Sequence, residues 1–89
     1  MEELFIHPHA LKHGISETEI HEAWSNYVAK RYRESPNEGQ VVCVGYSSCR
    51  PREIQLIGIQ KDFGILIYHA MSPAQDKVLR ELEINKRSL

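Results

Sequence analysis

The feature that most constrains the fold is a series of three short segments rich in Val, Ile and Leu in the second half of the chain. They cover residues 40–46, 53–60 and 65–71. β-Branched residues favour strands, and residues 47–52 and 61–64, which separate the segments, have the composition of turns. Strands joined by such short connections pair as antiparallel hairpins. The sequence therefore predicts an antiparallel β-meander of three strands, or four if a further strand precedes it.

A helix is predicted before this sheet. Ser16 and Glu19 match the capping-box pattern, in which each side chain binds the backbone N–H of the other residue. Apolar side chains follow at helical spacing, at Ile20, Ala23, Trp24, Tyr27 and Val28. From Tyr27 onward the pattern fits either the end of this helix or a short edge strand.

Two further helices are predicted near the ends of the chain. Residues 8–13 begin with Pro8 and are followed by Gly14, as a short helix would be. Ser72 is expected to cap a final helix, with Pro73 at its first position and Gln75 completing a second capping box. The predicted fold is a single α+β domain over residues 1–89, with two N-terminal helices, the meander and a C-terminal helix. The helices are expected on one face of the sheet.

Composition limits the function. The chain has 89 residues and a formal net charge of −1, with 42% hydrophobic residues. This composition argues against disorder and against a nucleic-acid binder that works by bulk charge alone. Two cysteines are too few for a disulfide scaffold, and no apolar stretch is long enough to span a membrane. Because the first residues lack a basic, apolar leader, we expect a cytoplasmic protein with no membrane partner.

One short motif and the order of elements resemble a known family. The motif is Lys12-His13-Gly14-Ile15-Ser16, followed by an acidic amphipathic helix, the meander and a closing helix. Together they resemble the BrnT-type toxins of the RelE-like ribonuclease group. The resemblance implies the toxin of a bacterial toxin–antitoxin pair, which cleaves RNA without a metal or other cofactor. It also implies a co-encoded antitoxin protein as partner, through which the chain could form an oligomer.

His69 is the first candidate catalytic residue, as an acid/base or a phosphate contact. It lies at the end of a predicted strand, just before a helix N-terminus, where a phosphate is favoured. Strict alternation places it on one face with Ile65, Ile67 and Met71. The alternative is a core histidine bonded to a backbone group.

Other candidate residues are basic or titratable. His13 is a candidate for proton transfer and Lys12 for phosphate binding, although both could simply cap the preceding helix. Arg33, in the densest basic cluster, and Arg52 are candidate RNA-phosphate contacts if they share one surface. The alternative for these arginines is a solvated surface.

No metal site is expected. His9 and His13 are four residues apart, but no Cys or carboxylate stands at a matching ligand spacing. The leading hypothesis is thus a metal-independent ribonuclease toxin. The alternative is an inactive protein–protein interaction module with a toxin-like fold, favoured by the net charge of −1. His69-Ala70-Met71 also stands where the family commonly has Ser-Ala-Arg.

Overall fold

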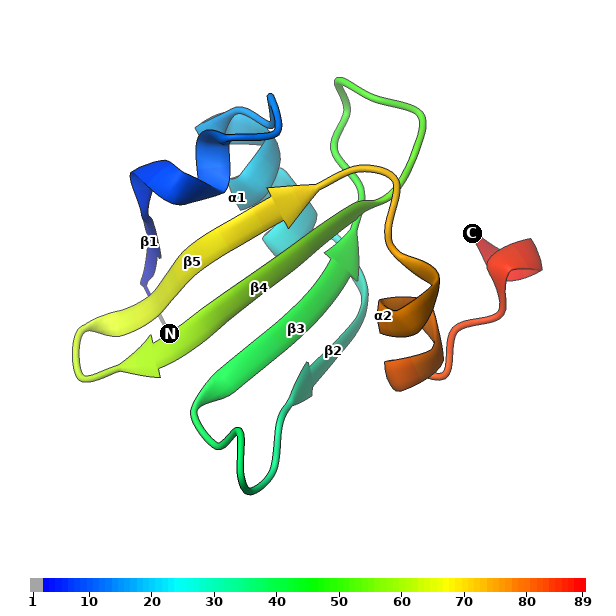
Figure 1. Cartoon of the computed structure of the whole chain (residues 1–89). Helices are drawn as coiled ribbons and strands as arrows, with labels where there is room; N and C mark the ends of the chain where they lie inside the picture. Colours follow the sequence, from blue (N-terminus) through cyan, green and yellow to red (C-terminus); the bar gives the residue numbers. More distant parts are fainter. Residues whose placement is uncertain (1–2) are drawn as a thin grey trace.

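A mixed five-stranded sheet forms the centre of the molecule (Figure 1). The computed structural model describes residues 3–89, and within them the strands lie in the order β1-β5-β4-β3-β2. The chain is α+β, as predicted. Its elements are β1 (Leu4–Ile6), the 3₁₀ helix η1 (Pro8–Leu11), α1 (Glu17–Ser25), β2 (Tyr27–Tyr32), β3 (Gln40–Gly45), β4 (Ile54–Lys61), β5 (Gly64–Met71), α2 (Asp76–Glu81) and the 3₁₀ helix η2 (Lys86–Ser88).

The meander is confirmed and carries a fourth antiparallel strand. β3 pairs with β4, and β4 pairs with β5, both antiparallel. β2 pairs antiparallel with β3 on the outer edge. Tyr27 and Val28 belong to this strand and are exposed, so the chain after α1 is an edge strand rather than a longer helix.

The N-terminal layout differs from the prediction. Residues 4–6 form β1, which runs parallel to β5, so the sheet is not a simple meander. The predicted first helix is only one 3₁₀ turn, Pro8–Leu11, which ends before Lys12. Three residues are too few to show the alternation by which a strand is recognised in a sequence. Pairing with β5 and packing of Leu4 and Ile6 against the core stabilise the strand.

The capping box at α1 is present. The Ser16 hydroxyl accepts from the Glu19 amide at 3.2 Å, and the Glu19 carboxylate accepts from the Ser16 amide at 3.2 Å. The helix ends at Ser25. The second predicted capping box is wrong, because α2 begins only after Gln75, which makes no side-chain capping bond. The Ser72 hydroxyl instead donates to the carbonyl of Glu53 at 2.7 Å.

The two α-helices cover opposite faces of the sheet, which corrects the prediction of helices on one face (Figure 1). Ile20 and Ala23 of α1 pack in a core with Val41 and Cys43 of β3. Alternate residues of the same strand, Val42 and Val44, belong to a second core with Val78, Leu79 and Leu82 from the α2 side. A strand buried on both faces loses the apolar–polar alternation that would have revealed this arrangement.

A β-bulge in β5 moves His69 to a different face from the one predicted. Ile57 pairs with His69, whereas the next residue, Gly58, pairs with Ile67, so Tyr68 is an extra residue. Ile65 and Ile67 are buried on the α1 side. His69 shares the α2 side with Ile57, because directly paired residues lie on one face. The expected common face of Ile65, Ile67 and His69 is therefore wrong.

Candidate functional site

A groove of about 390 Å³ lies between the sheet and α2. The bulge in β5 presents His69 to it, and the chain leaving β2 supplies Arg33. Two predicted site residues thus meet on one surface. The lining residues are Arg33, Ile57, His69, Gln75, Lys77, Val78 and Glu81.

His69 is half-buried and hydrogen-bonded to a neighbouring strand. Its Nε2 lies 3.1 Å from Nε2 of Gln55, a fully buried residue of β4. Burial lowers the pKa of His69, and the positive charges of His13, His9 and Lys77 lower it further. This shift favours the neutral form of the imidazole. His69 is not bonded to a backbone group in the way the core-histidine alternative expected.

His13 lies against His69. The ring centroids are 5.6 Å apart, and the ring planes meet at 71°. The η1 turn fixes this approach at the edge of β5, because Ala10 is buried in the core and the His7 amide donates to the carbonyl of Ile67 at 2.8 Å. His13 itself remains exposed. The structure thus brings together the two predicted catalytic residues, which are 56 positions apart in the sequence.

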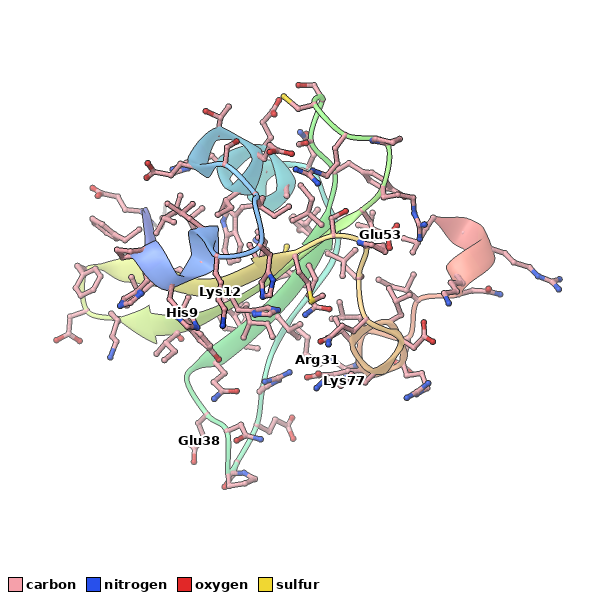
Figure 2. The ribbon with its side chains drawn as sticks, turned by 45° about the horizontal axis from the view of Figure 1, so that its top comes forward. His9, Lys12, Arg31, Glu38, Glu53 and Lys77 are labelled. Carbon is pink, nitrogen blue, oxygen red and sulfur yellow. The ribbon has the colours of Figure 1, made fainter. Side chains whose placement is uncertain are left out.

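Further basic side chains lie on the same side of the molecule as this pair. His9 and Lys12 are exposed on and just after η1, and Lys77 is exposed on α2 (Figure 2). Lys12 donates its backbone N–H to the carbonyl of His9 at 3.3 Å, as at the end of a helical turn. This bond agrees with the capping alternative for Lys12 and leaves its side chain exposed to solvent.

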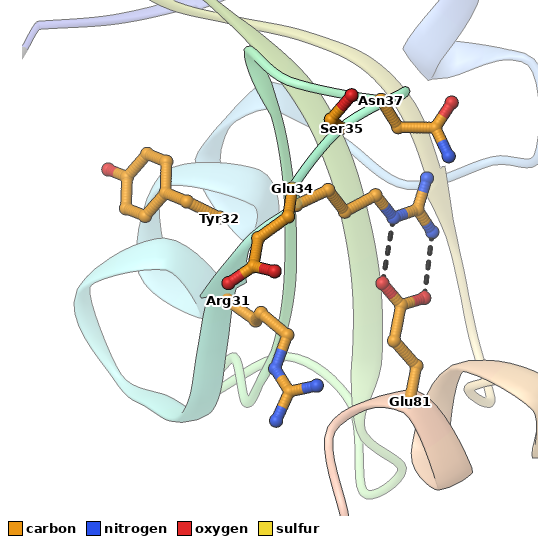
Figure 3. Close-up of a pocket in the computed structure, with 7 residues that line it drawn as sticks. Arg31, Tyr32, Glu34, Ser35, Asn37 and Glu81 are labelled. Carbon is orange, nitrogen blue, oxygen red and sulfur yellow. Dashed lines mark hydrogen bonds and ion pairs between the residues drawn. The ribbon is translucent and has the colours of Figure 1, made fainter.

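Arg33 is held by a carboxylate. Its Nε and one terminal nitrogen each donate to a Glu81 oxygen at 2.8 Å (Figure 3). Its other terminal nitrogen donates to Gln40 at 2.7 Å. The Glu81 bonds raise the pKa of Arg33, while Arg33 lowers the pKa of Glu81. Both residues also line a second, open hollow of about 820 Å³ beside the β2–β3 turn. The charge of Arg33 is thus compensated within the protein.

Arg52 is not part of this groove. It lies on the loop before β4, and its guanidinium donates to Glu53 at 3.2 and 3.4 Å. Glu53 is buried and also accepts from the Ala74 amide at 2.9 Å. Burial acts to raise the pKa of Glu53, but the Ala74 amide and Arg52 lower it on balance. Arg52 therefore supports the segment before α2, and it does not line the groove that contains Arg33.

Metal ligands do not cluster in the described part of the chain. Among residues 3–89, no group of three or more His, Cys, Asp and Glu side chains is placed to hold a metal ion. In the same range, no helix is both long enough and apolar enough to span a membrane.

The sequence interpretation missed Lys77, Glu81 and Gln55. Lys77 and Glu81 are four residues apart, so they lie on one side of α2. Gln55 could have been recognised from the sequence, because it is a polar residue within an apolar strand, between Ile54 and Leu56. A buried polar residue is normally hydrogen-bonded, and here its partners are the groove residues His69 and Gln75.

The chemistry that this arrangement can perform is proton transfer beside an anion. Imidazoles exchange protons near neutral pH, and lysine binds phosphate as a point charge.

Comparisons with protein-family models, with curated proteins and with solved structures give no match to this chain. The residues of the groove therefore provide the evidence for a function.

Proposed function

We propose that the protein is a metal-independent ribonuclease whose reaction centre is the His13–His69 pair. The observation that carries the proposal is the 5.6 Å separation of these two imidazoles at a groove lined by Lys77 and Arg33. Cleavage of RNA by its own 2′-hydroxyl needs a base, a group at the phosphoryl or leaving oxygen, and nearby positive charge. The site supplies each of these residue types.

The proposed reaction is a transesterification. The RNA 2′-oxygen bonds to the adjacent phosphorus, while its proton passes to one site histidine or a water. The bond from phosphorus to the 5′-oxygen breaks, and the leaving oxygen receives a proton. The products are a 2′,3′-cyclic phosphate and a free 5′-hydroxyl, with no oxidant, reductant or metal consumed. Lys77 and Lys12 would contact the phosphates, since both side chains are exposed cations on this side.

The biological role follows the family resemblance. We propose that the chain is a BrnT-like toxin and that a co-encoded antitoxin protein covers the histidine pair. Induced expression should arrest growth and degrade cellular RNA. The His69→Ala variant should relieve both effects, and co-expression of the neighbouring gene should do the same.

Purified protein tests the chemistry directly. Wild type, His13→Ala and His69→Ala are incubated with RNA in EDTA, and the products are assayed for cyclic phosphate ends. Each variant should lose cleavage by about 100-fold or more, the usual contribution of a proton-transfer group or of a hydrogen-bond donor to the phosphoryl oxygen. His21→Ala is the matched control, because His21 is exposed on α1 and does not line the groove. Equal rates for folded wild type and His69→Ala would refute the assignment.

A protein–protein interaction module is the second candidate. It is favoured by the ion pairs of Arg33 with Glu81 and of Arg52 with Glu53, which occupy two of the predicted phosphate contacts. The two candidates differ in salt dependence, because RNA contacts made by cations weaken as salt rises. RNA binding that declines with salt supports the ribonuclease, whereas no RNA binding at any salt supports the interaction module.

A further inference from the structure

Gln55 joins the candidate site to the start of α2. Its side chain is fully buried on β4 and makes three hydrogen bonds. Oε1 accepts from the Gln75 backbone N–H at 2.9 Å, and Nε2 donates to Oε1 of Gln75 at 3.1 Å. Nε2 also lies 3.1 Å from Nε2 of His69.

The backbone amide of Gln75 decides which way the Gln55 side chain points. A backbone N–H can only donate, so the Gln55 atom facing it must be the oxygen. The nitrogen of Gln55 therefore faces Gln75 Oε1 and His69. Its two hydrogens serve these two partners, and both polar atoms of the buried amide are satisfied.

This orientation determines the tautomer of His69. The Gln55 nitrogen has hydrogens and no acceptor site, so Nε2 of His69 must accept through its lone pair. The ring proton is then on Nδ1. Protonation of Nε2 would set two N–H donors against each other in a place where Gln55 cannot rotate without losing both bonds to Gln75.

The charged groups around His69 act in the same direction. His9 and His13 approach from the η1 side, and Lys77 lies on α2. Arg33 also lines the groove, and the groove carboxylate, Glu81, is already paired with it. The described residues thus place no free carboxylate against the ring to stabilise an imidazolium.

We propose that Gln55 is a positioning residue that keeps His69 neutral in the Nδ1–H form. This inference deepens the proposed ribonuclease function and divides the roles within the pair. A neutral ring whose Nε2 is occupied cannot take a proton there from the 2′-hydroxyl. His69 would instead donate from Nδ1–H to a non-bridging phosphoryl oxygen, and His13, which is exposed, would transfer the proton.

The first test is ¹⁵N NMR of the histidine side chains in the intact wild-type protein, titrated with acid. Neutral imidazole nitrogens with and without a proton have well-separated shifts, so the spectrum reports the tautomer directly. His69 should show a protonated Nδ1 and an unprotonated Nε2 at neutral pH. A protonated Nε2 in the wild-type spectrum would overturn the proposal, whatever the variants do.

The second test changes the partner. In Gln55→Glu a carboxylate replaces the donor, so His69 should acquire a proton on Nε2 and its pKa should rise above the wild-type value. Gln55→Met removes the donor without adding charge, and the Nε2–H form should become populated. Gln60→Glu and Gln60→Met are matched controls on the exposed end of β4 and should leave the His69 signals unchanged. An unchanged tautomer and pKa in folded Gln55→Glu would refute the positioning role.

Activity separates this inference from the proposed function. If the protein cleaves RNA, Gln55→Glu should reduce cleavage by about tenfold or more and shift the pH–rate profile. Gln60→Glu should retain the wild-type profile. If the wild type cleaves no RNA, the ribonuclease proposal fails, while the NMR result still decides the tautomer.

Discussion

Arg33 and Glu81 form a two-point ion pair that joins the strand side of the groove to α2. Each of two guanidinium nitrogens lies 2.8 Å from a separate carboxylate oxygen. The side chains are 23% and 27% exposed, so water screens this pair less than a fully exposed one. The same pair borders both the His69 groove and the hollow at the β2–β3 turn, because both residues line both spaces.

Glu81→Gln should therefore change stability and ligand binding in opposite directions. Loss of the ion pair should lower the free energy of unfolding by about 1 kcal/mol, as expected for a charged hydrogen bond with partial solvent screening. The released Arg33 should strengthen RNA binding and steepen its dependence on salt. Urea unfolding and RNA titration at several salt concentrations measure the two effects. Glu83→Gln is the control, since its pair with Arg31 is 80% exposed at Glu83 and should contribute little.

The central part of the fold could be predicted from the sequence, and its edges could not. The β3–β4–β5 meander follows from apolar segments separated by turn residues, and the α1 start follows from Ser16 and Glu19. β1 is too short to show alternation, and its partner β5 is distant in the sequence. The sequence did not show that helices cover both faces of the sheet, because β3 is buried on both sides and lacks apolar–polar alternation.

The candidate site was predictable by residue type but not by geometry. His13, His69 and Arg33 were recognisable as titratable or cationic groups in a nearly neutral chain. Their relative positions depend on the Tyr68 bulge. No Gly or Pro stands next to Tyr68 to indicate it, because the glycine of β5, Gly64, lies at the start of the strand. The pairing of Arg33 with Glu81 depends on how α2 packs across the sheet, which local spacing does not contain.

Gly45→Ala should strongly destabilise the protein. A Cβ at this position would overlap the carbonyl of Ala23, where α1 packs directly on β3. Because backbone atoms cannot yield as a side chain can, we expect a loss of about 3 kcal/mol or more in the free energy of unfolding. Gly39→Ala is the comparison. A Cβ there meets no atom within 4 Å, and only its φ of +90° is unfavourable, so the loss should be about 1 kcal/mol. Equal losses in the two variants would contradict the proposed close packing.

Glu19→Gln should remove part of the dependence of stability on acid pH. Hydrogen bonds from Arg50 lower the pKa of Glu19 from 4.5 to about 2, with further bonds from Ser16. A carboxyl with a depressed folded-state pKa contributes stability that is fully present above about pH 4.5 and is lost as pH falls through about 2. The gap in unfolding free energy between wild type and Glu19→Gln should therefore narrow over this range. Urea unfolding at about pH 6, 4 and 3 measures this difference in unfolding free energy. Glu17→Gln, in the same helical turn, controls for loss of a carboxylate that has no arginine partner in the described contacts.

His69 should make the protein less stable as the solution becomes mildly acidic. Its pKa is lowered from 6.5 in the folded state by burial and by the charges of His13, His9 and Lys77. The unfolded chain then binds more protons than the folded one. The contribution of neutral His69 to the free energy of unfolding is therefore fully present above about pH 6.5 and falls as the pH falls below that value.

His69→Gln cannot titrate, and its amide oxygen can still accept from Gln55. Urea unfolding at about pH 7.5 and 5.5 should show a smaller loss for this variant than for wild type, and His21→Gln should behave as wild type. Equal losses in wild type and His69→Gln would mean that protonation of His69 is not coupled to folding. The neutral Nδ1–H form of His69, held by Gln55, would then not stabilise the folded protein as expected.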